Sequence, residues 1–166
     1  MYDELTKEDI KEMQDEIDYR TCVLRPRLIE EVQTARAFGD LSENFEYKAA
    51  KLEKNRNDSR IRYLEKMIKT AKIISDNSDA NEVGLGDKVT VYIEEDDEEE
   101  LYRIVTSVRQ DVLSGVISKT SPVGKALLGK KVGDRVKIIV SSDYSYYVQV
   151  RKIEKSSSEG LPIMGF

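Results

Sequence analysis

Two acidic residues in a short turn are the positions at which this sequence could do chemistry. Asp40 and Glu43 lie three residues apart in the segment Gly39-Asp40-Leu41-Ser42-Glu43-Asn44. Magnesium prefers oxygen ligands and usually takes one or two protein carboxylates together with phosphates and water. Two carboxylates therefore cannot hold the ion alone, but they could complete a magnesium site whose other ligands belong to a partner.

A structural role competes with this chemistry. Asp-x-x-Glu is the carboxylate version of a capping box, in which both side chains satisfy backbone N–H groups at the start of a helix. The two charges of Asp40 and Glu43 would also complement the helix dipole. The residue types alone favour capping, so the metal role depends on where the turn lies in the fold.

Apolar residues spaced three and four positions apart flank this turn and predict two helices. The first pattern runs from a cap at Thr6 to Gly39, with a mild kink expected at Pro26 because proline removes a helical hydrogen bond. The second reaches Ile74. The apolar and core-type positions are Ile10, Met13, Ile17, Leu24, Leu28, Val32 and Ala35, followed by Tyr47, Ala50, Lys54, Asn57, Ile61, Leu64, Ile68 and Ala71.

Only the few residues around Gly39 to Ser42 separate the two helical patterns. A connection this short makes the two helices antiparallel neighbours. Arms of about 30 residues would be roughly 45 Å long at the helical rise. Residues 3–18 hold eight acidic residues and two lysines, and residues 51–72 hold eight basic residues and three acidic ones. An antiparallel hairpin sets these segments side by side, so we expect opposite charges to flank the seam. The acidic pair then stands at the far end of a long hairpin.

The second half of the chain changes to alternating apolar and polar residues, which predicts strands. The expected strands are Lys88–Ile93, Leu101–Val108, Gly115–Ser118, Arg135–Val140 and Tyr146–Ile153. Ser121 and Pro122 predict the start of a short helix that ends at Gly129. The acidic run Glu94–Glu100 is interpreted as a solvated hairpin loop.

These patterns predict an α+β chain in which a mostly antiparallel sheet with one helix follows the hairpin. The predicted division is a hairpin with an acidic tip over residues 1–76, a linker over 77–83, a sheet domain over 84–155 and a loose tail over 156–166.

Composition excludes several classes of function. The chain has no histidine, which removes imidazole bases and the common zinc motifs. A net charge of −5 argues against a non-specific DNA binder. The one cysteine, Cys22, allows no internal disulfide, and no run of about 18 apolar residues is present to span a bilayer. We therefore expect a cytoplasmic protein without a membrane partner.

Several motifs together resemble the Gre transcript-cleavage factors of bacteria, and within that family the GreA branch. They are Leu24-Arg25-Pro26-Arg27-Leu28-Ile29, Ala35-Arg36-Ala37-Phe38-Gly39-Asp40-Leu41-Ser42-Glu43-Asn44, Glu46-Tyr47-Lys48-Ala49-Ala50-Lys51, Tyr102-Arg103-Ile104-Val105, Ile117-Ser118 and Ser121-Pro122 with Lys125-Ala126-Leu127-Leu128-Gly129-Lys130. The resemblance covers roughly residues 5 to 155. Departures include Phe45, where the family commonly has a small residue, the segment Ser141–Tyr147 and the longer tail.

The resemblance implies a coiled-coil hairpin and an FKBP-like second domain. It implies that the hairpin enters the secondary channel of RNA polymerase and that Asp40 and Glu43 hold a Mg²⁺ ion shared with the polymerase active site, with Ser42 as a supporting hydroxyl. The polymerase would then cleave its own backtracked RNA. No cofactor is expected on the protein alone, which would be a monomer and no enzyme by itself.

The same resemblance implies two further contacts. Arg36, Lys48 and Lys51 would form a basic patch that contacts phosphates at the 3′ end of the nascent RNA, with ordinary surface cations as the alternative reading. Ser121 and Pro122 are candidates for contact with the rim of the polymerase channel, although they could simply cap and start their helix.

Two other functions remain open. The protein could enter the same channel as an inhibitor that does not stimulate cleavage, but the intact Asp40 and Glu43 argue against this. A prolyl isomerase on an FKBP-like domain needs an aromatic-lined apolar cup. The second domain offers few aromatics besides the tyrosines within 144–147, so this alternative is the weakest.

Overall fold

A computed structural model of the chain describes residues 3–39 and 44–165. It contains two compact units, one built from Glu8–Lys72 and the other from Glu4–Lys7 together with Ile73–Gly165. The finer boundaries expected from the sequence, including a separate linker and tail, stay predictions. Among the described residues, no helix is both long and apolar enough to cross a membrane.

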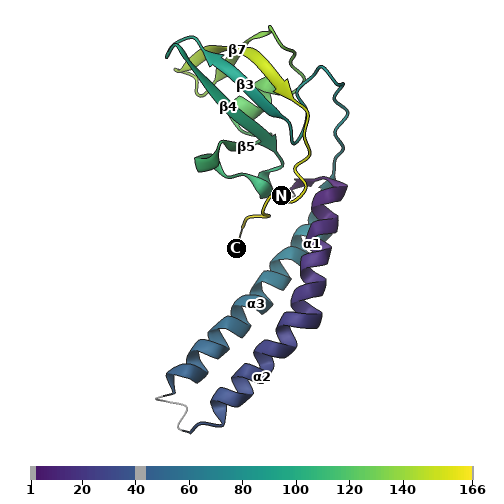
Figure 1. Cartoon of the computed structure of the whole chain (residues 1–166), viewed down its shortest axis with the longest axis vertical. Coiled ribbons are helices and arrows are strands. Elements are labelled where there is room, and N and C mark those ends of the chain that lie inside the picture. Colours follow the sequence, from purple (N-terminus) through teal and green to yellow (C-terminus); the bar gives the residue numbers. More distant parts are fainter. Residues whose placement is uncertain (1–2, 40–43, 166) are drawn as a thin grey trace. The chain divides into compact units, whose positions relative to one another are not determined.

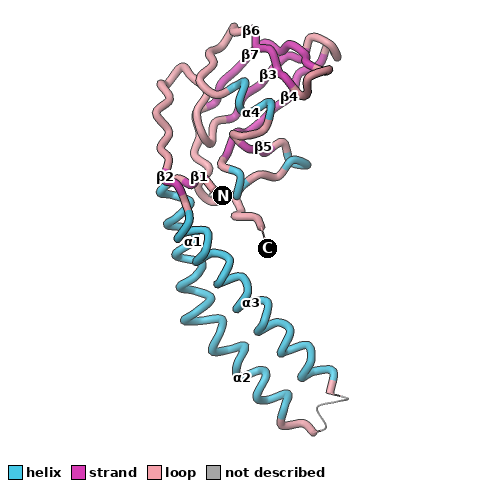
Figure 2. The backbone as a smooth tube through the Cα atoms, turned by 180° about the vertical axis from the view of Figure 1, so that it is seen from behind, coloured by secondary structure: helices cyan, strands magenta, loops and turns pink. Residues whose placement is uncertain are grey.

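The helical unit is an antiparallel hairpin (Figures 1 and 2). One arm contains α1 (Lys7–Tyr19), a π-helical turn (Arg20–Leu24) and α2 (Arg25–Arg36), and the other arm is α3 (Phe45–Thr70). The predicted α+β class with an N-terminal hairpin is confirmed. The predicted helix limits were wrong by a few residues: α2 ends at Arg36 rather than Gly39, and α3 ends at Thr70 rather than Ile74.

The helix distortion expected near Pro26 takes the form of the π-helical turn. Proline has no N–H, and its ring crowds the carbonyl four residues earlier, which here belongs to Cys22. The N–H of Arg25 instead reaches the carbonyl of Arg20, five residues back. A wider turn of this kind accommodates the ring without ending the helix.

Buried apolar side chains from both arms form the seam of the hairpin. They are Met13, Ile17, Leu28 and Ala35 on one arm and Ile61, Leu64 and Met67 on the other. Asn57 is also buried, as its core-type position predicted. Arg20 Nη1 donates to Asn57 Oδ1 at 3.0 Å, and Asn57 Nδ2 donates to the carbonyl of Arg20 at 3.2 Å. Because a buried amide needs these partners, Asn57 specifies the register of the arms.

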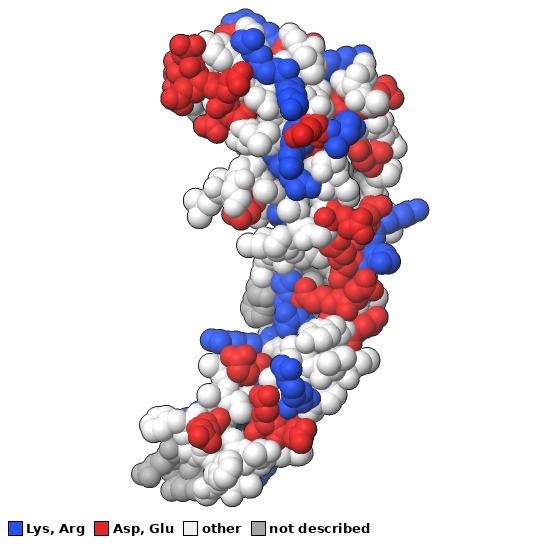
Figure 3. Space-filling model, viewed as in Figure 1, with Lys and Arg blue, Asp and Glu red and all other residues white. Residues whose placement is uncertain are grey.

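Opposite charges pair across the seam, as the charge distribution predicted. Arg60 donates to Glu16 through Nε at 2.7 Å and Nη2 at 3.1 Å. Arg25 Nε lies 3.3 Å from Asp58. Acidic side chains gather over α1 (Figure 3). Glu16 also accepts from Arg20 on its own arm at 2.8 Å, so one carboxylate joins both arms.

Glu16 should make the stability of the hairpin depend on pH. Burial acts to raise the pKa of this carboxyl, but the hydrogen bonds from Arg60 and Arg20 outweigh it and hold the pKa below the ordinary 4.5. A lowered folded-state pKa stabilises the fold above the unfolded value and loses that contribution as the pH falls through the folded value. The melting temperature should therefore fall more steeply below about pH 4.5 in the wild type than in Glu16→Gln.

Circular-dichroism melts at several pH values test this expectation. Asp15→Asn is the matched control, because Asp15 pairs with Lys11 at 3.6 Å on the exposed surface of the same helix. Exposed pairs contribute little to stability. Parallel curves for the wild type and Glu16→Gln would contradict the assignment.

The second unit contains a five-stranded sheet with the order β5-β4-β3-β7-β6. Its elements are β3 (Lys88–Ile93), β4 (Glu98–Val105), β5 (Val116–Ser118), α4 (Pro122–Leu127), β6 (Arg135–Ile139) and β7 (Ser145–Glu154), with short 3₁₀ turns at Ser107–Arg109 and Val112–Ser114. The β4–β5 pair is parallel and the other pairs are antiparallel. Two residues each from β1 (Glu4–Leu5) and β2 (Lys72–Ile73) form a separate small sheet.

One face of the five-stranded sheet carries the core of this unit. Alternate residues of β3 are buried, namely Val89, Val91 and Ile93. They pack with Ile138 of β6 and with Leu127 of α4, and α4 lies over this face of the sheet (Figures 1 and 2). The predicted mostly antiparallel sheet with one short helix is therefore confirmed.

The acidic run was only partly a loop. Strand β4 begins at Glu98, so Glu98–Glu100 pair with β3, and the turn is confined to residues 94–97. Asp97 occupies the left-handed region of this turn, at φ 51°. The backbone of these acidic residues can pair because their side chains stay in solvent. The same strand ends at Val105 rather than Val108.

The described part of the segment beyond residue 155 is hydrogen-bonded to the sheet unit. The N–H of Ser156 donates to Asp87 Oδ1 at 2.9 Å. Arg109 Nη1 donates to the carbonyl of Leu161 at 2.7 Å, and the N–H of Met164 donates to the carbonyl of Val108 at 2.6 Å. These bonds position Ser156–Met164 against its own unit.

Candidate functional site at the hairpin tip

The residues with the strongest chemical prediction lie outside the described part of the chain. These are Asp40, Ser42 and Glu43. The site is therefore built from the two chain ends that hold this segment, the end of α2 and the start of α3.

Helix α2 closes with a tightened turn. The N–H of Ala37 reaches the carbonyls of Gln33 and Thr34 at 3.2 Å, and the N–H of Phe38 reaches the carbonyl of Ala35 at 3.2 Å. Gly39 follows with φ 128°, a backbone conformation in which a residue with a side chain would be strained. Glycine at this position lets the chain leave the helix and enter the turn.

Asn44 holds the other side of the tip. Its Oδ1 accepts from the N–H of Tyr47 at 3.0 Å, which makes it the N-cap of α3. Its Nδ2 donates to the carbonyl of Ala35 at 2.6 Å, so the same side chain connects α3 to the last turn of α2. One amide thus fixes the spacing of the two arms where the acidic segment begins and ends.

The capping box proposed for Asp40 and Glu43 was wrong. Helix α3 begins at Phe45, and its N-cap is Asn44, so the cap lies after both carboxylates. The sequence carried a signal for this, because asparagine is among the strongest N-cap residues. No role was predicted for Asn44 from the sequence. In the structure it positions the start of α3 against the end of α2.

The predicted basic patch lies at the tip end of both arms. Arg36 is the last residue of α2, Lys48 lies in the first turn of α3, and Lys51 follows in the next turn; all three are exposed. The Lys48 ammonium lies 5.6 Å from the ring centroid of Phe45, and the Lys51 ammonium lies 5.9 Å from that of Tyr47. Neither Arg36 nor Lys51 forms an ion pair with the described residues.

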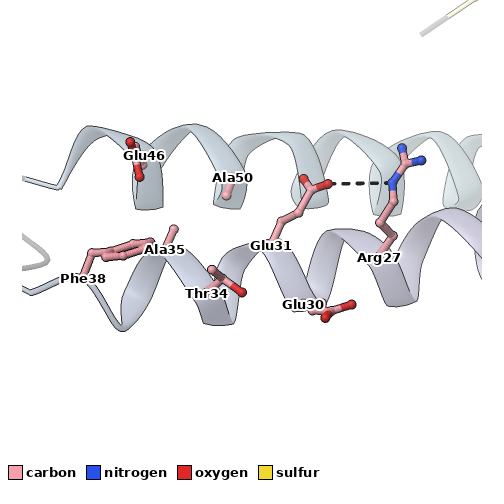
Figure 4. Close-up of a pocket in the computed structure, with 8 residues that line it drawn as sticks. All are labelled: Arg27, Glu30, Glu31, Thr34, Ala35, Phe38, Glu46 and Ala50. Atoms are coloured by element: carbon pink, nitrogen blue, oxygen red, sulfur yellow. Dashed lines mark ion pairs between the residues drawn. The ribbon is translucent and has the colours of Figure 1, made fainter.

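A groove of about 400 Å³ runs between the arms near the tip (Figure 4). It is lined by Arg27, Glu30, Glu31, Thr34, Ala35, Phe38, Glu46 and Ala50. Arg27 and Glu31 form an ion pair at 3.7 Å. The net negative charge of the groove lining therefore comes from Glu30 and Glu46. This acidic lining does not suit a phosphate backbone. None of the three basic-patch residues lines the groove, so RNA would contact a different surface of the tip.

The two candidates for a polymerase contact lie in the sheet unit. The Ser121 hydroxyl accepts from the N–H of Gly124 at 3.0 Å and lies 2.6 Å from the carbonyl of Ser118, to which it donates. It is therefore used for capping α4, as its structural alternative predicted. Pro122 is exposed at the first position of that helix.

Within residues 3–39 and 44–165, no three acidic, histidine or cysteine side chains are placed to hold a metal ion. The chemistry of Asp40 and Glu43 still fits magnesium, since both carboxylates offer hard oxygen atoms. Neither carboxylate supplies the side-chain cap of α3, because Asn44 does.

Known proteins match the chain over both units. A family model described as "Transcription elongation factor, N-terminal" matches residues 4–73, and one described as "Transcription elongation factor, GreA/GreB, C-term" matches residues 77–155. The chain is 44% identical over 134 residues to transcription elongation factor GreA of Bacillus subtilis (strain 168), covering 81% of this chain and 85% of that protein.

A second relative, transcription elongation factor GreA of Thermoanaerobacter pseudethanolicus, is 46% identical over 137 residues, with 82% of this chain and 87% of that protein covered. Among solved structures, GreA factor homolog 1 (Gfh1) of Thermus thermophilus is 26% identical with a TM-score of 0.43, and the match covers 93% of this chain and 100% of that one.

Proposed function

The chain belongs to the GreA/GreB family of transcription elongation factors, and from that membership we propose that it stimulates cleavage of backtracked RNA by RNA polymerase. The hairpin enters the secondary channel of the enzyme and brings Asp40 and Glu43 to its active site. The polymerase then hydrolyses its own transcript and resumes elongation from the new 3′ end. Arrested complexes are rescued in this way.

The observation that carries the proposal is the way Asn44 organises the tip. Asn44 caps α3 and bonds to the carbonyl of Ala35. The two arms are thereby held together next to the acidic segment, without using either carboxylate as the side-chain cap of α3. We infer that Asp40 and Glu43, which lie between these two arms in the sequence, are the groups offered to a partner.

The carboxylates of Asp40 and Glu43 contribute negative charge and oxygen ligands to the shared site. The chemistry that a bound Mg²⁺ would supply there is stabilisation of the attacking and leaving oxygens of the scissile phosphodiester. Ser42 supplies a hydroxyl that can orient water beside the two carboxylates. We expect the chain to act as a factor on the polymerase and not as a nuclease itself, in keeping with its family.

The second unit docks on the outside of the polymerase, at the rim of the channel. Pro122 is the better of the two predicted contact residues, because it is exposed while the Ser121 hydroxyl is already hydrogen-bonded. We place the protein in the cytoplasm as a monomer whose partners are RNA polymerase and the 3′ end of the nascent RNA.

The direct test uses a stalled elongation complex with RNA labelled at its 3′ end. Added protein should release short labelled fragments and let the shortened transcript be extended again. A channel-binding inhibitor would instead slow elongation and release no fragments. The intact acidic pair favours stimulation, and absence of fragments at saturating protein would refute it.

The basic patch should act through phosphate contacts that weaken as salt rises. We expect Arg36→Ala combined with Lys51→Ala to slow cleavage at low salt and to lower the salt dependence of binding. Each phosphate contact on a single strand contributes about 0.7 to the slope of log K against log salt, so losing two should reduce the slope by about 1.4. The main products should be fragments of two or three nucleotides.

Cleavage rates and fragment lengths at several ionic strengths measure this effect. The matched control is Arg62→Ala with Lys66→Ala, two exposed cations of α3 that lie far from the tip. If the patch variant behaves like this control at low salt, or if long fragments are the main product, the basic patch does not contact the RNA.

A further inference from the structure

The segment Ser156–Met164 is bonded to the sheet unit although it lies outside the span that the family model matches. That match covers residues 77–155, so family membership carries no expectation for the residues that follow. The last residues of a domain are usually poorly ordered unless specific bonds tie them down. Here the bonds gather at two places, one anchor near the start of the segment and one near its end.

The first anchor holds Ser156 against the turn that precedes β3. Its N–H donates to Asp87 Oδ1 at 2.9 Å, and its hydroxyl accepts from Arg103 Nη2 at 3.1 Å. Gly86 lies against the same residue, because a Cβ added to this glycine would come within 2.8 Å of the Ser156 carbonyl oxygen. The sheet unit therefore has a fitted seat for the start of the segment.

The second anchor holds the 3₁₀ turn Ser107–Arg109. Arg109 is only 1% exposed, and its Nη1 donates to the carbonyl of Leu161 at 2.7 Å. The N–H of Met164 donates to the carbonyl of Val108 at 2.6 Å. A buried guanidinium group loses stability when one of its acceptors is removed. Release of the segment should therefore favour a shift of this turn toward water.

The same 3₁₀ turn is hydrogen-bonded to the residues that precede α4. The hydroxyl of Ser107 lies 2.8 Å from the hydroxyl of Ser118, the last residue of β5. The carbonyl of Ser118 accepts from the Ser121 hydroxyl at 2.6 Å, and Pro122 follows at the exposed start of α4. A short series of hydrogen bonds thus leads from the second anchor to the candidate polymerase contact.

We propose that Ser156–Met164 is a positioning segment for docking on RNA polymerase. It holds the 3₁₀ turn, and Ser107 of that turn holds the residues that present Pro122. The inference rests on the proposed function, in which the sheet unit docks at the rim of the channel. When the segment is released, only a fraction of the molecules keeps the contact correctly placed. The apparent dissociation constant then rises in inverse proportion to that fraction.

The experiment measures the binding of full-length variants to core RNA polymerase, by competition with fluorescently labelled wild type. Met164→Pro removes the N–H that reaches the carbonyl of Val108, and Met164→Ala is the matched control because it keeps that N–H. Since one hydrogen bond contributes about 1 kcal/mol, a change of about fivefold, Met164→Pro should bind about threefold to fivefold more weakly than the wild type. Met164→Ala should bind as tightly as the wild type.

A second variant, a chain that ends at Lys155, removes both anchors and should bind about tenfold more weakly. Strand β7 ends at Glu154, so this variant keeps all five strands of the sheet, and circular dichroism verifies its fold. At saturating protein, both Met164→Pro and this shortened chain should reach the wild-type cleavage rate, because the hairpin is unchanged. Weaker binding with an unchanged maximal rate separates a role in docking from a role at the tip.

Ser107→Ala tests the route from the segment to α4. It removes the hydroxyl that reaches Ser118 and leaves the segment in place. We expect it to weaken binding by a factor similar to that of Met164→Pro, and we expect the two changes combined to have no larger effect. The matched control is Ser114→Ala, because Ser114 is an exposed hydroxyl bonded to Asp111 in the neighbouring 3₁₀ turn. Met164→Pro should keep its full effect in that background.

Three results would overturn the positioning role. The first is wild-type binding by both Met164→Pro and the chain that ends at Lys155. The second is an equal loss of binding in Met164→Ala and Met164→Pro, which would indicate direct contact of the side chain with the polymerase. The third is full multiplication of the effects of Met164→Pro and Ser107→Ala, which would mean that the segment acts by another route.

The binding measurement does not depend on cleavage, so the two proposals can fail separately. A wild type that binds polymerase but releases no RNA fragments refutes the proposed function alone. A wild type that releases fragments, together with variants that bind as tightly as it does, refutes the positioning role alone.

Discussion

Asp40→Asn and Glu43→Gln are each expected to lower stimulated cleavage by at least roughly 100-fold, the scale seen when a group acting on the reacting oxygens is removed. An amide keeps the shape of the side chain but loses the negative charge that attracts magnesium. Polymerase binding should stay nearly intact, because the basic patch and the docking unit are unchanged.

The identity of the α3 cap also predicts the thermal stability of the Asp40→Asn and Glu43→Gln variants. If the two carboxylates capped α3, each substitution would cost about 1 kcal/mol of stability. Since Asn44 provides the cap, the melting temperature of both variants should match the wild type. Loss of activity without loss of stability separates a chemical role from a structural one.

Two measurements check the acidic pair together. Single-turnover cleavage gives the rate, and competition between variant and wild type for the stalled complex gives the binding. Glu46→Gln is the matched control, because Glu46 is an exposed carboxylate in the first turn of α3. Wild-type cleavage rates in both acidic variants, or a loss of binding that accounts for the whole loss of cleavage, would show that the assigned role is wrong.

Asn44→Ala should have the second largest effect, because one side chain makes two bonds at the tip. Removing the cap of α3 should destabilise the hairpin by about 1 kcal/mol. Losing the bond to the carbonyl of Ala35 frees the arms to separate where the acidic segment is attached. A displacement of about 1 Å at a reacting centre can cost about 100-fold in rate, so cleavage should fall by roughly 10- to 100-fold.

Asn44→Asp separates the two bonds. Aspartate keeps an oxygen for the N–H of Tyr47 and is itself a strong N-cap residue, but it cannot donate to the carbonyl of Ala35. We expect near wild-type thermal stability in this variant together with reduced cleavage. Full activity in a stable Asn44→Asp protein would show that the cross-arm bond does not position the tip.

The sequence by itself determined the elements whose signals are local. Apolar residues at helical spacing, such as Met13, Ile17 and Leu64, predicted the hairpin and are buried in its seam. Ser121 followed by Pro122 predicted the start of α4, because capping involves only a few neighbouring residues. The alternating pattern of β3 predicted its bounds, since one face of that strand is buried.

Tertiary structure decided the features that depend on residues far apart in the chain. Glu98–Glu100 form a strand because β3 provides backbone partners for them, which no local pattern of acidic residues records. Asp40, Glu43 and Asn44 all had the chemistry of a cap, and local propensity alone did not choose among them. The bond from Asn44 to Ala35 involves the opposite arm, nine residues earlier, and it exists only when the two helices are paired.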